Sequence, residues 1–242
     1  MIFDFHARRH PGLPGVLTAA GIDRALVSAG GLIDLDRLSV QLDDGGRAAV
    51  GAANEDVAAL CARSAGRLLP CFFADPVRDV PSYRERAGDF RGLEISPAVH
   101  GFELADPGVH ELVTIAAAHR HPVYVVTTAR PGSRPADLAR LARRHPGSTF
   151  VWGHCGHTGL GFAGLAAIAP VPTILAELSG CLTVTARAAV DRLGASRVLF
   201  GTEFPLQHPS VELAKLAALP LTAAQRHAVT WANACRLLNE EM

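Results

Sequence analysis

Histidine, arginine and glutamate side chains follow short apolar runs of this sequence. His6 lies in the first run and Arg8 just after it. His154 follows the run FVW, and Glu203 follows the run VLF and a glycine. Imidazole and carboxylate groups transfer protons and bind metal ions, whereas the planar guanidinium of arginine suits carboxylates. These residue types predict acid–base or metal-assisted chemistry on a small anionic molecule.

The segments between these residues alternate between two patterns. Short apolar or β-branched runs predict strands near 2–6, 24–28, 68–74, 92–96, 122–127, 149–153, 173–178 and 197–201. Amphipathic, alanine-rich stretches predict helices, most clearly at 55–65, 107–120, 134–145, 184–194 and 222–238. Strands that alternate with helices pair in parallel. Eight of them predict an α/β fold of the closed (β/α)8, or TIM barrel, type, with an open doubly wound sheet as the alternative.

The length supports one barrel, because 242 residues are close to the roughly 250 typical of this fold. We therefore expect a single domain over residues 1–242. The stretch 30–53 is rich in glycine and aspartate and shows no clear period. We expect it to be a loop at the end of the barrel where loops carry function.

A barrel brings the polar residues at the carboxyl ends of its strands to one mouth. We expect Glu203, His154 and His6 to be catalytic, with Glu203 as a general acid or base whose pKa is raised by an enclosed site. Ser179 is a further polar residue at a strand end. The residues expected to bind substrate are Arg8, Glu94, Thr127, His100, Glu177 and His208. The structural alternatives are a carboxylate bonded to loop N–H groups for Glu203, a packing residue for His154, and an inert hydrogen-bonded ladder with Asp4 for His6 and Arg8. We interpret His121 as structural, because it closes a helical segment where a positive charge complements the helix dipole.

The composition argues against several functional classes. The 23 basic and 23 acidic residues balance. The sequence has no basic stripe with interleaved aromatic residues, so we do not expect a nucleic-acid partner. The apolar runs are shorter than the roughly 20 residues of a membrane span, and the N-terminus lacks the apolar segment of a signal peptide. Five cysteines without a CxxC pair predict reduced thiols and a cytoplasmic location. No surface pattern identifies an interface, so a homo-oligomer is left open.

Six segments, in order along nearly the whole chain, resemble the amidohydrolase superfamily. The resemblance is to its amidohydrolase 2, or amidohydrolase-related, group, which includes decarboxylases and lactonases. IFDFHARRH is similar to the opening DxHxH strand, FVWGHCGH to the sixth-strand HxG, and SRVLFGTEFP to the final GSDxP strand. The remaining matches are ERAGDFRGLEISPAVHGFELADP, HPVYVVTT and LTAAQRHAVTWANACRLLN, which resemble strand 4, strand 5 and the terminal helix.

The chain departs from this group at the metal site. The resembled first strand supplies two metal-binding histidines, but Arg8 stands at the second position, the strand-5 histidine is absent, and Glu203 stands where an aspartate is usual. A catalytic zinc site needs three protein ligands, and His6, His154 and Glu203 are the tentative set. Against it, the charge of Arg8 at ~5 Å and an effective dielectric of ~20 repels a divalent ion by roughly 6–7 kcal/mol. We therefore expect either no cofactor or a single divalent metal ion, for which zinc is a candidate.

The sequence predicts an amidohydrolase-like enzyme that acts on a small, carboxylate-bearing molecule with little or no metal dependence. The reaction would be lactone or amide hydrolysis, the reverse cyclisation, or decarboxylation. Two alternatives stay open. One is a zinc-dependent hydrolase with an altered His6/His154/Glu203 ligand shell, and the other is a non-catalytic barrel used for binding.

Overall fold

Eight parallel strands form one sheet whose spatial order is the order of the chain. The computed structural model describes residues 1–156 and 159–241, so the last histidine of FVWGHCGH lies outside the described residues. The strands are β1 (Phe3–Arg8), β2 (Arg24–Ser28), β3 (Leu68–Ala74), β4 (Gly92–Ile95), β5 (Val123–Val125), β6 (Phe150–Trp152), β7 (Ile174–Glu177) and β8 (Val198–Leu199). Backbone bonds from Phe5 N to Phe200 O (2.9 Å) and from Glu203 N to His6 O (2.8 Å) join β1 to the segment after β8. The predicted single-domain (β/α)8 barrel is confirmed.

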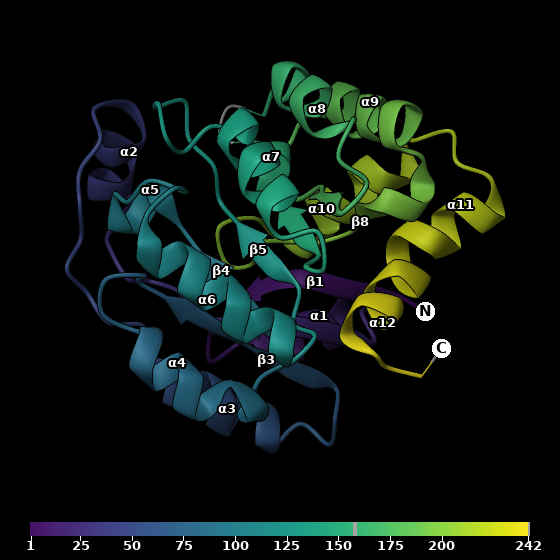
Figure 1. Cartoon of the computed structure of the whole chain (residues 1–242). Helices are drawn as coiled ribbons and strands as arrows, with labels where there is room; N and C mark the ends of the chain where they lie inside the picture. Colours follow the sequence, from purple (N-terminus) through teal and green to yellow (C-terminus); the bar gives the residue numbers. More distant parts are fainter. Residues whose placement is uncertain (157–158, 242) are drawn as a thin grey trace.

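Helices connect successive strands and surround the barrel (Figure 1). They are α1 (Leu13–Ala19), α2 (Leu35–Asp43), α3 (Asn54–Ala62), α4 (Val80–Arg86), α5 (Pro97–His100), α6 (Pro107–Ala118), α7 (Pro135–Arg144), α8 (Phe162–Ile168), α9 (Thr183–Leu193), α10 (Pro209–Ala217), α11 (Ala223–His227) and α12 (Asn233–Leu238). A π-helical turn, Ala228–Ala232, joins α11 to α12. The five clearest helical predictions correspond to α3, α6, α7, α9 and this last segment.

The stretch 30–53 connects β2 to α3 as expected for a βα loop, but it is not irregular throughout, because it contains α2. The side chain of Asp34 accepts a hydrogen bond from the backbone N–H of Arg37 (2.7 Å) and so caps the helix. The buried amide of Gln41 donates to the carbonyls of Ala98 and Val99, both at 3.0 Å. A helix this short is held mainly by tertiary contacts, and these leave no periodic signal in the sequence.

Two clusters of buried apolar side chains hold the barrel together. The smaller cluster extends from Trp231, in the π-helical turn, to Phe3, Phe5 and Tyr124. The ring of Tyr124 stacks on His6, with centroids 4.0 Å apart and an interplanar angle of 11°. Core packing therefore supports the strand ends directly.

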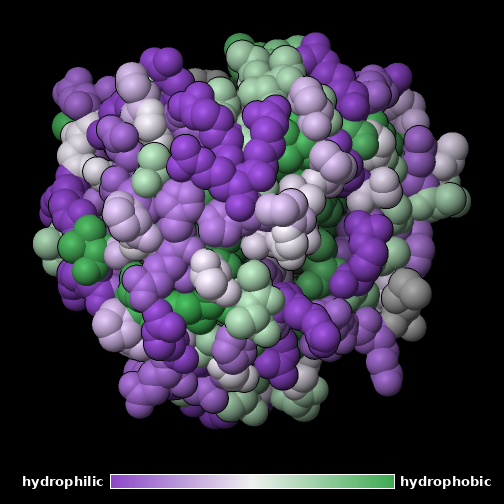
Figure 2. All heavy atoms as spheres, viewed as in Figure 1, coloured by the Kyte–Doolittle hydropathy of each residue, from purple (hydrophilic) through white to green (hydrophobic). Residues whose placement is uncertain are grey.

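The surface is largely polar on the face that Figure 2 shows, and strongly hydrophobic groups appear there mostly in recesses. The two chain termini lie at one end of the barrel, and α2 lies at the other (Figure 1). Among the described residues, no helix combines the length and apolarity needed to cross a bilayer. All five cysteines are free and buried.

The buried His121 leads to a prediction about stability. Its Nδ1 lies 2.8 Å from the hydroxyl of Tyr83. Burial, helped by the nearby His119, lowers the pKa of His121 from 6.5 to about 4. Its folded pKa is thus below the unfolded value, so the stability it provides is complete above pH 6.5 and is lost as the pH falls toward 4. We expect this share to be about 3 kcal/mol of the free energy of unfolding.

The measurement is urea unfolding at pH 7, 6, 5 and 4 for the wild type and for His121→Gln. Glutamine can still accept a hydrogen bond from Tyr83 but does not titrate. The wild type should lose more stability on acidification than the variant. Equal losses in the two proteins would contradict the assignment.

Candidate active site

Four ionisable side chains from three segments contact one another at the carboxyl ends of the strands. Nη1 of Arg8 lies 2.8 Å from both carboxylate oxygens of Glu94, and its Nε lies 2.9 Å from Oε1 of Glu203. Nε2 of His6 lies 3.2 Å from Oε2 of Glu94, and its Nδ1 contacts Oε2 of Glu203. Two basic side chains of β1 therefore alternate with one carboxylate from β4 and one from the loop after β8.

The charges in this set follow from burial opposed by ion pairing. Burial acts to raise the pKa of Glu94, but Arg8 and His6 outweigh it and hold that pKa at about 2. Burial acts to lower the pKa of His6, but the carboxylates of Glu203 and Glu94 prevail over burial and over Arg8 and raise it to about 9. At neutral pH the set therefore carries two positive and two negative charges, and they sum to zero.

The expectation that an enclosed site raises the pKa of Glu203 is wrong. Burial does act in that direction, but Arg8, His6 and His154 together hold the pKa of this carboxyl well below its usual range. A carboxylate of such low pKa accepts a proton poorly at neutral pH. In this geometry Glu203 anchors Arg8 and His6.

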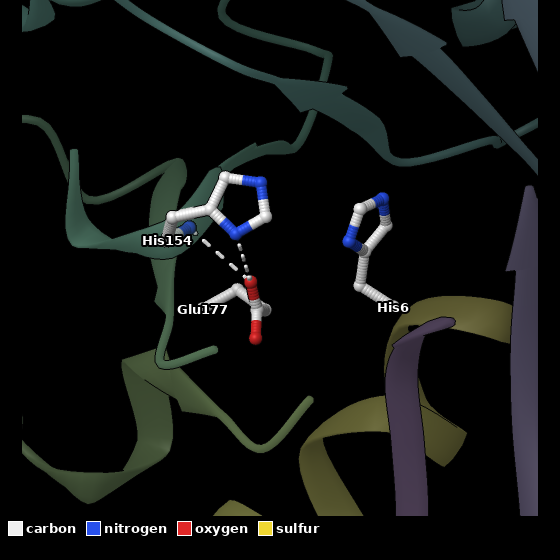
Figure 3. A group of neighbouring side chains, drawn as sticks. All are labelled: His6, His154 and Glu177. Atoms are coloured by element: carbon white, nitrogen blue, oxygen red, sulfur yellow. Dashed lines mark hydrogen bonds and ion pairs between the residues drawn. The ribbon is translucent and has the colours of Figure 1, made fainter. Parts of the chain in front are cut away.

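His154 lies in a second polar group, formed by residues of β5 and β7 and of the loops that follow β6 and β7. Its Nδ1 lies 2.8 Å from Oγ of Ser179, which lies 2.8 Å from Oε2 of Glu177. Glu177 also accepts hydrogen bonds from the hydroxyl of Tyr124 (2.7 Å) and from the backbone N–H groups of Ser179 (2.6 Å) and His154 (3.2 Å). Figure 3 shows His154 above this carboxylate, with His6 to the right of both.

The second ring nitrogen of His154 connects the two groups. Nε2 lies 3.5 Å from Oε2 of Glu203 and 3.4 Å from the hydroxyl of Tyr124. Sequence reasoning missed Tyr124, because an aromatic residue inside an apolar run resembles a core residue. Two glycines are the sequence signal that could have pointed to this polar group, because both positions need to lack a side chain. A Cβ at Gly153 would lie 2.6 Å from the Tyr124 hydroxyl, and one at Gly201 would lie 2.3 Å from Oε1 of Glu177.

Several residues expected to bind substrate lie elsewhere or are already engaged. His100 is fully buried and packs edge-on against an aromatic ring of β3. The hydroxyl of Thr127 accepts a hydrogen bond from the indole of β6. His208 caps α10 through its own ring. Glu94 and Glu177 are fully buried and bonded to protein groups. The positions of these five residues therefore give no support to the prediction that they contact substrate.

Two adjoining cavities open at the mouth, and Arg8 and Glu203 border both of them. One has a volume of about 410 Å³, and the other, which His154 also borders, has about 290 Å³. The remaining walls are mostly apolar and include Ile33, Leu38, Leu42, Val99, Val126 and Leu206. Among the described residues, Nη2 of Arg8 has no hydrogen-bond partner, unlike its Nε and Nη1. One edge of the guanidinium is thus left for a ligand.

A cluster of metal-ligand type exists in this site. His6, His154 and Glu177 each place one ligand atom within 4.8 Å of the others (Figure 3). The carboxylate of Glu177 already accepts four hydrogen bonds, however, and Nδ1 of His154 is bonded to Ser179. A metal ion at this cluster would compete with hydrogen-bond donors for the oxygens of Glu177, and with Ser179 if it bound Nδ1 of His154.

The set predicted from sequence, with Glu203 in place of Glu177, is also a poor match for a divalent ion. Nδ1 of His6 and Oε2 of Glu203 have no hydrogen bond of good geometry among the described residues, yet they contact each other and leave no space for an ion between them. Arg8 holds the other oxygen of the same carboxylate. Arg8 and His6 already neutralise Glu94 and Glu203, so these two carboxylates would not offset the added charge.

Comparisons with known proteins give a family and a fold. The chain matches the amidohydrolase family model over residues 4–239, and no curated protein sequence matches it. A 2,6-dihydroxybenzoate decarboxylase from Rhizobium aligns with a TM-score of 0.71 and 16% identity over 98% of both chains. A 5-carboxyvanillate decarboxylase from Novosphingobium aromaticivorans, complexed with manganese and 4-hydroxy-3-methoxy-5-nitrobenzoic acid, aligns at 0.72 and 16% over 95% of this chain and 80% of that one. An amidohydrolase from Burkholderia multivorans with bound HEPES aligns at 0.73 and 16% over 100% of both.

The charge set predicts a large cost for Glu94→Gln. This substitution leaves Arg8 and His6 sharing one buried carboxylate, and breaking a buried pair costs about 3–5 kcal/mol. The free energy of unfolding, measured in urea at pH 7, should fall by this amount. The matched control is Glu103→Gln on the surface, which should change it by less than about 0.5 kcal/mol. Similar values for the two variants would mean that the buried charges are not coupled.

Proposed function

The chain belongs to the amidohydrolase family, and on this premise we propose that it hydrolyses a lactone or amide bond of a small, carboxylate-bearing molecule by acid–base chemistry without a metal ion. One observation carries the proposal: His154 borders the smaller cavity, its Nε2 lies 3.5 Å from Oε2 of Glu203, and its Nδ1 lies 2.8 Å from Oγ of Ser179. An imidazole that lies beside a carboxylate at a cavity can take up and return a proton during a reaction.

In the proposed reaction, His154 is the general base. A water molecule attacks the substrate carbonyl carbon as Nε2 of His154 takes one of its protons. Oε2 of Glu203 stabilises the resulting imidazolium. When the tetrahedral intermediate collapses, the carbonyl re-forms, the bond to the leaving oxygen or nitrogen breaks, and the imidazolium returns its proton to that atom. The products are the ring-opened acid and its alcohol or amine group.

Arg8 orients the substrate in this proposal. Its Nη2 group is free to donate hydrogen bonds to a carboxylate, and its charge also favours the negative oxygen of the tetrahedral intermediate. Glu94 and Glu203 fix the guanidinium through Nη1 and Nε, so it needs little reorganisation on binding. The apolar walls from α2 and from Val99 and Leu206 favour a substrate with a compact apolar body.

The first test measures hydrolysis of a panel of small lactones and lactams by pH-stat, with and without prior dialysis against EDTA, together with the metal content of the purified protein. We expect turnover that survives metal removal and falls by roughly 10²–10⁴ in His154→Asn. Activity that is lost with EDTA and restored by zinc would favour the zinc-dependent alternative. Release of carbon dioxide from the carboxylate-bearing compounds would instead identify a decarboxylase, and no turnover of any compound would favour a binding protein.

The role of Arg8 can be tested without altering the protein. Each carboxylate-bearing lactone is compared with its methyl ester, which keeps the shape but removes the charge. Losing a hydrogen bond to a charged group costs about 1.5–3 kcal/mol, so kcat/KM should fall by roughly 10-fold to 150-fold. Lactones without a carboxylate provide the reference. Esterifying another group on these lactones should change kcat/KM little. Equal kcat/KM for acid and ester would remove Arg8 from substrate binding.

A further inference from the structure

We infer that the larger of the two cavities at the mouth is a separate subsite, which binds an aliphatic chain of a carboxylate-bearing substrate. This subsite deepens the proposed function and rests on it for the position of the reacting group. Arg8, which borders both cavities, holds the carboxylate at their junction. The aliphatic chain extends from there into the larger cavity, away from His154.

The two cavities share part of their walls but not the proposed base. The residues that border both are Arg8, Leu38, Val99, Glu203 and Leu206. Among the described residues, His154 borders the smaller cavity of about 290 Å³ and not the larger one. In the proposed reaction, the carbonyl attacked by water therefore lies in the smaller cavity, together with the compact body of the substrate. The larger cavity, of about 410 Å³, is free for another part of the ligand.

The walls of the larger cavity are mainly aliphatic. The aliphatic residues that border it include Leu32, Ile33, Leu35, Leu38, Val99 and Leu206. Leu35 and Leu206 are 62% and 52% exposed, which leaves apolar surface in contact with water. A ligand that covered these side chains would remove this surface from water and gain binding free energy.

The aromatic ring at this cavity favours an aliphatic chain over an aromatic group. Phe73 is the one phenylalanine, tyrosine or tryptophan that borders it among the described residues. The guanidinium of Arg8 lies over the Phe73 ring, with Cζ 5.5 Å from the centroid, and His100 packs edge-on against the same ring. Phe73 is 2% exposed, so it offers no free face for stacking. A methylene chain needs no such face and gains its contacts from the leucine and isoleucine side chains.

The charged groups around the larger cavity leave one guanidinium edge for an anionic head group. Arg9 pairs with Asp56 at 2.9 Å, and the carboxylate of Asp34 caps α2. Nη2 of Arg8 has no hydrogen-bond partner in the described part of the chain, whereas its Nε and Nη1 are bonded. An amphiphilic carboxylate fits both features, because its head group can bind Arg8 while its chain packs against the walls.

The test is isothermal titration calorimetry of the full chain at pH 7 with butyrate, hexanoate, octanoate and decanoate. Burying one methylene group strengthens binding by roughly threefold to fourfold, so the affinity should rise with length until the cavity is full. The matching 1-alkanols lack the charge and should bind at least about tenfold more weakly. Ile33→Trp fills the larger cavity and should abolish the gain with length. The matched variant Val126→Trp fills the smaller cavity and should keep this gain.

An affinity that does not depend on chain length would overturn the inference, as would a gain lost in Val126→Trp and kept in Ile33→Trp. Ile33→Ala adds no bulk and decides the question if the tryptophan variants do not fold. It should weaken octanoate binding by roughly threefold or more and butyrate binding by less, and equal effects on the two would contradict the subsite.

The lactone panel connects this subsite to the proposed function. For carboxylate-bearing lactones that are hydrolysed, kcat/KM should rise with the length of an attached alkyl chain in the wild type and not in Ile33→Trp. If no lactone is turned over, the proposed function fails, while the alkanoate titrations still decide whether the subsite exists. Hydrolysis without any dependence of alkanoate binding on chain length would keep the proposed function and remove the subsite.

Discussion

The buried ion pairing of Arg8 is the interaction on which the site depends. Taking a guanidinium out of water costs several kcal/mol unless carboxylates and hydrogen bonds replace the lost solvation. Glu94 and Glu203 provide this compensation from opposite sides, and His6 ties the same two carboxylates together. The first strand, the fourth strand and the loop after the eighth strand are thereby joined at the mouth of the barrel. This set also orients the arginine, because two of its three nitrogens are occupied by the protein.

The same interaction separates the roles of the polar residues. Arg8 and His6 hold the pKa of Glu203 well below its usual range despite its burial, which favours His154 as the group that exchanges protons. His154 lies between the charged set and the hydrogen-bonded group of Glu177, Ser179 and Tyr124. One group provides charge and the other sets geometry. In the proposed function, a guanidinium that belongs to the chain does work that would otherwise call for an exchangeable cation, so activity would not depend on metal supply.

The apolar cavity is shaped by an element that the sequence hid. Leu38 and Leu42 of α2 form part of its walls, yet α2 is short and is anchored through Gln41 to backbone carbonyls far along the chain. Such long-range bonds have no counterpart in local periodicity. The shape of these cavities is therefore decided by packing between the second and fourth β–α loops, although the sequence of the second loop shows no clear period.

The sequence by itself determined the barrel, because alternating apolar runs and amphipathic stretches leave few other ways to bury their apolar faces. It also placed His6, Arg8, His154 and Glu203 at strand ends, where barrel geometry brings them to one mouth. Only the tertiary structure decided how these groups act on one another. The protonation of Glu203 depends on which charges lie within a few ångströms of it, and the engagement of Glu177 and Tyr124 depends on neighbours from other strands. Burial and charge proximity are properties of three-dimensional contacts, so residue type and spacing cannot specify them.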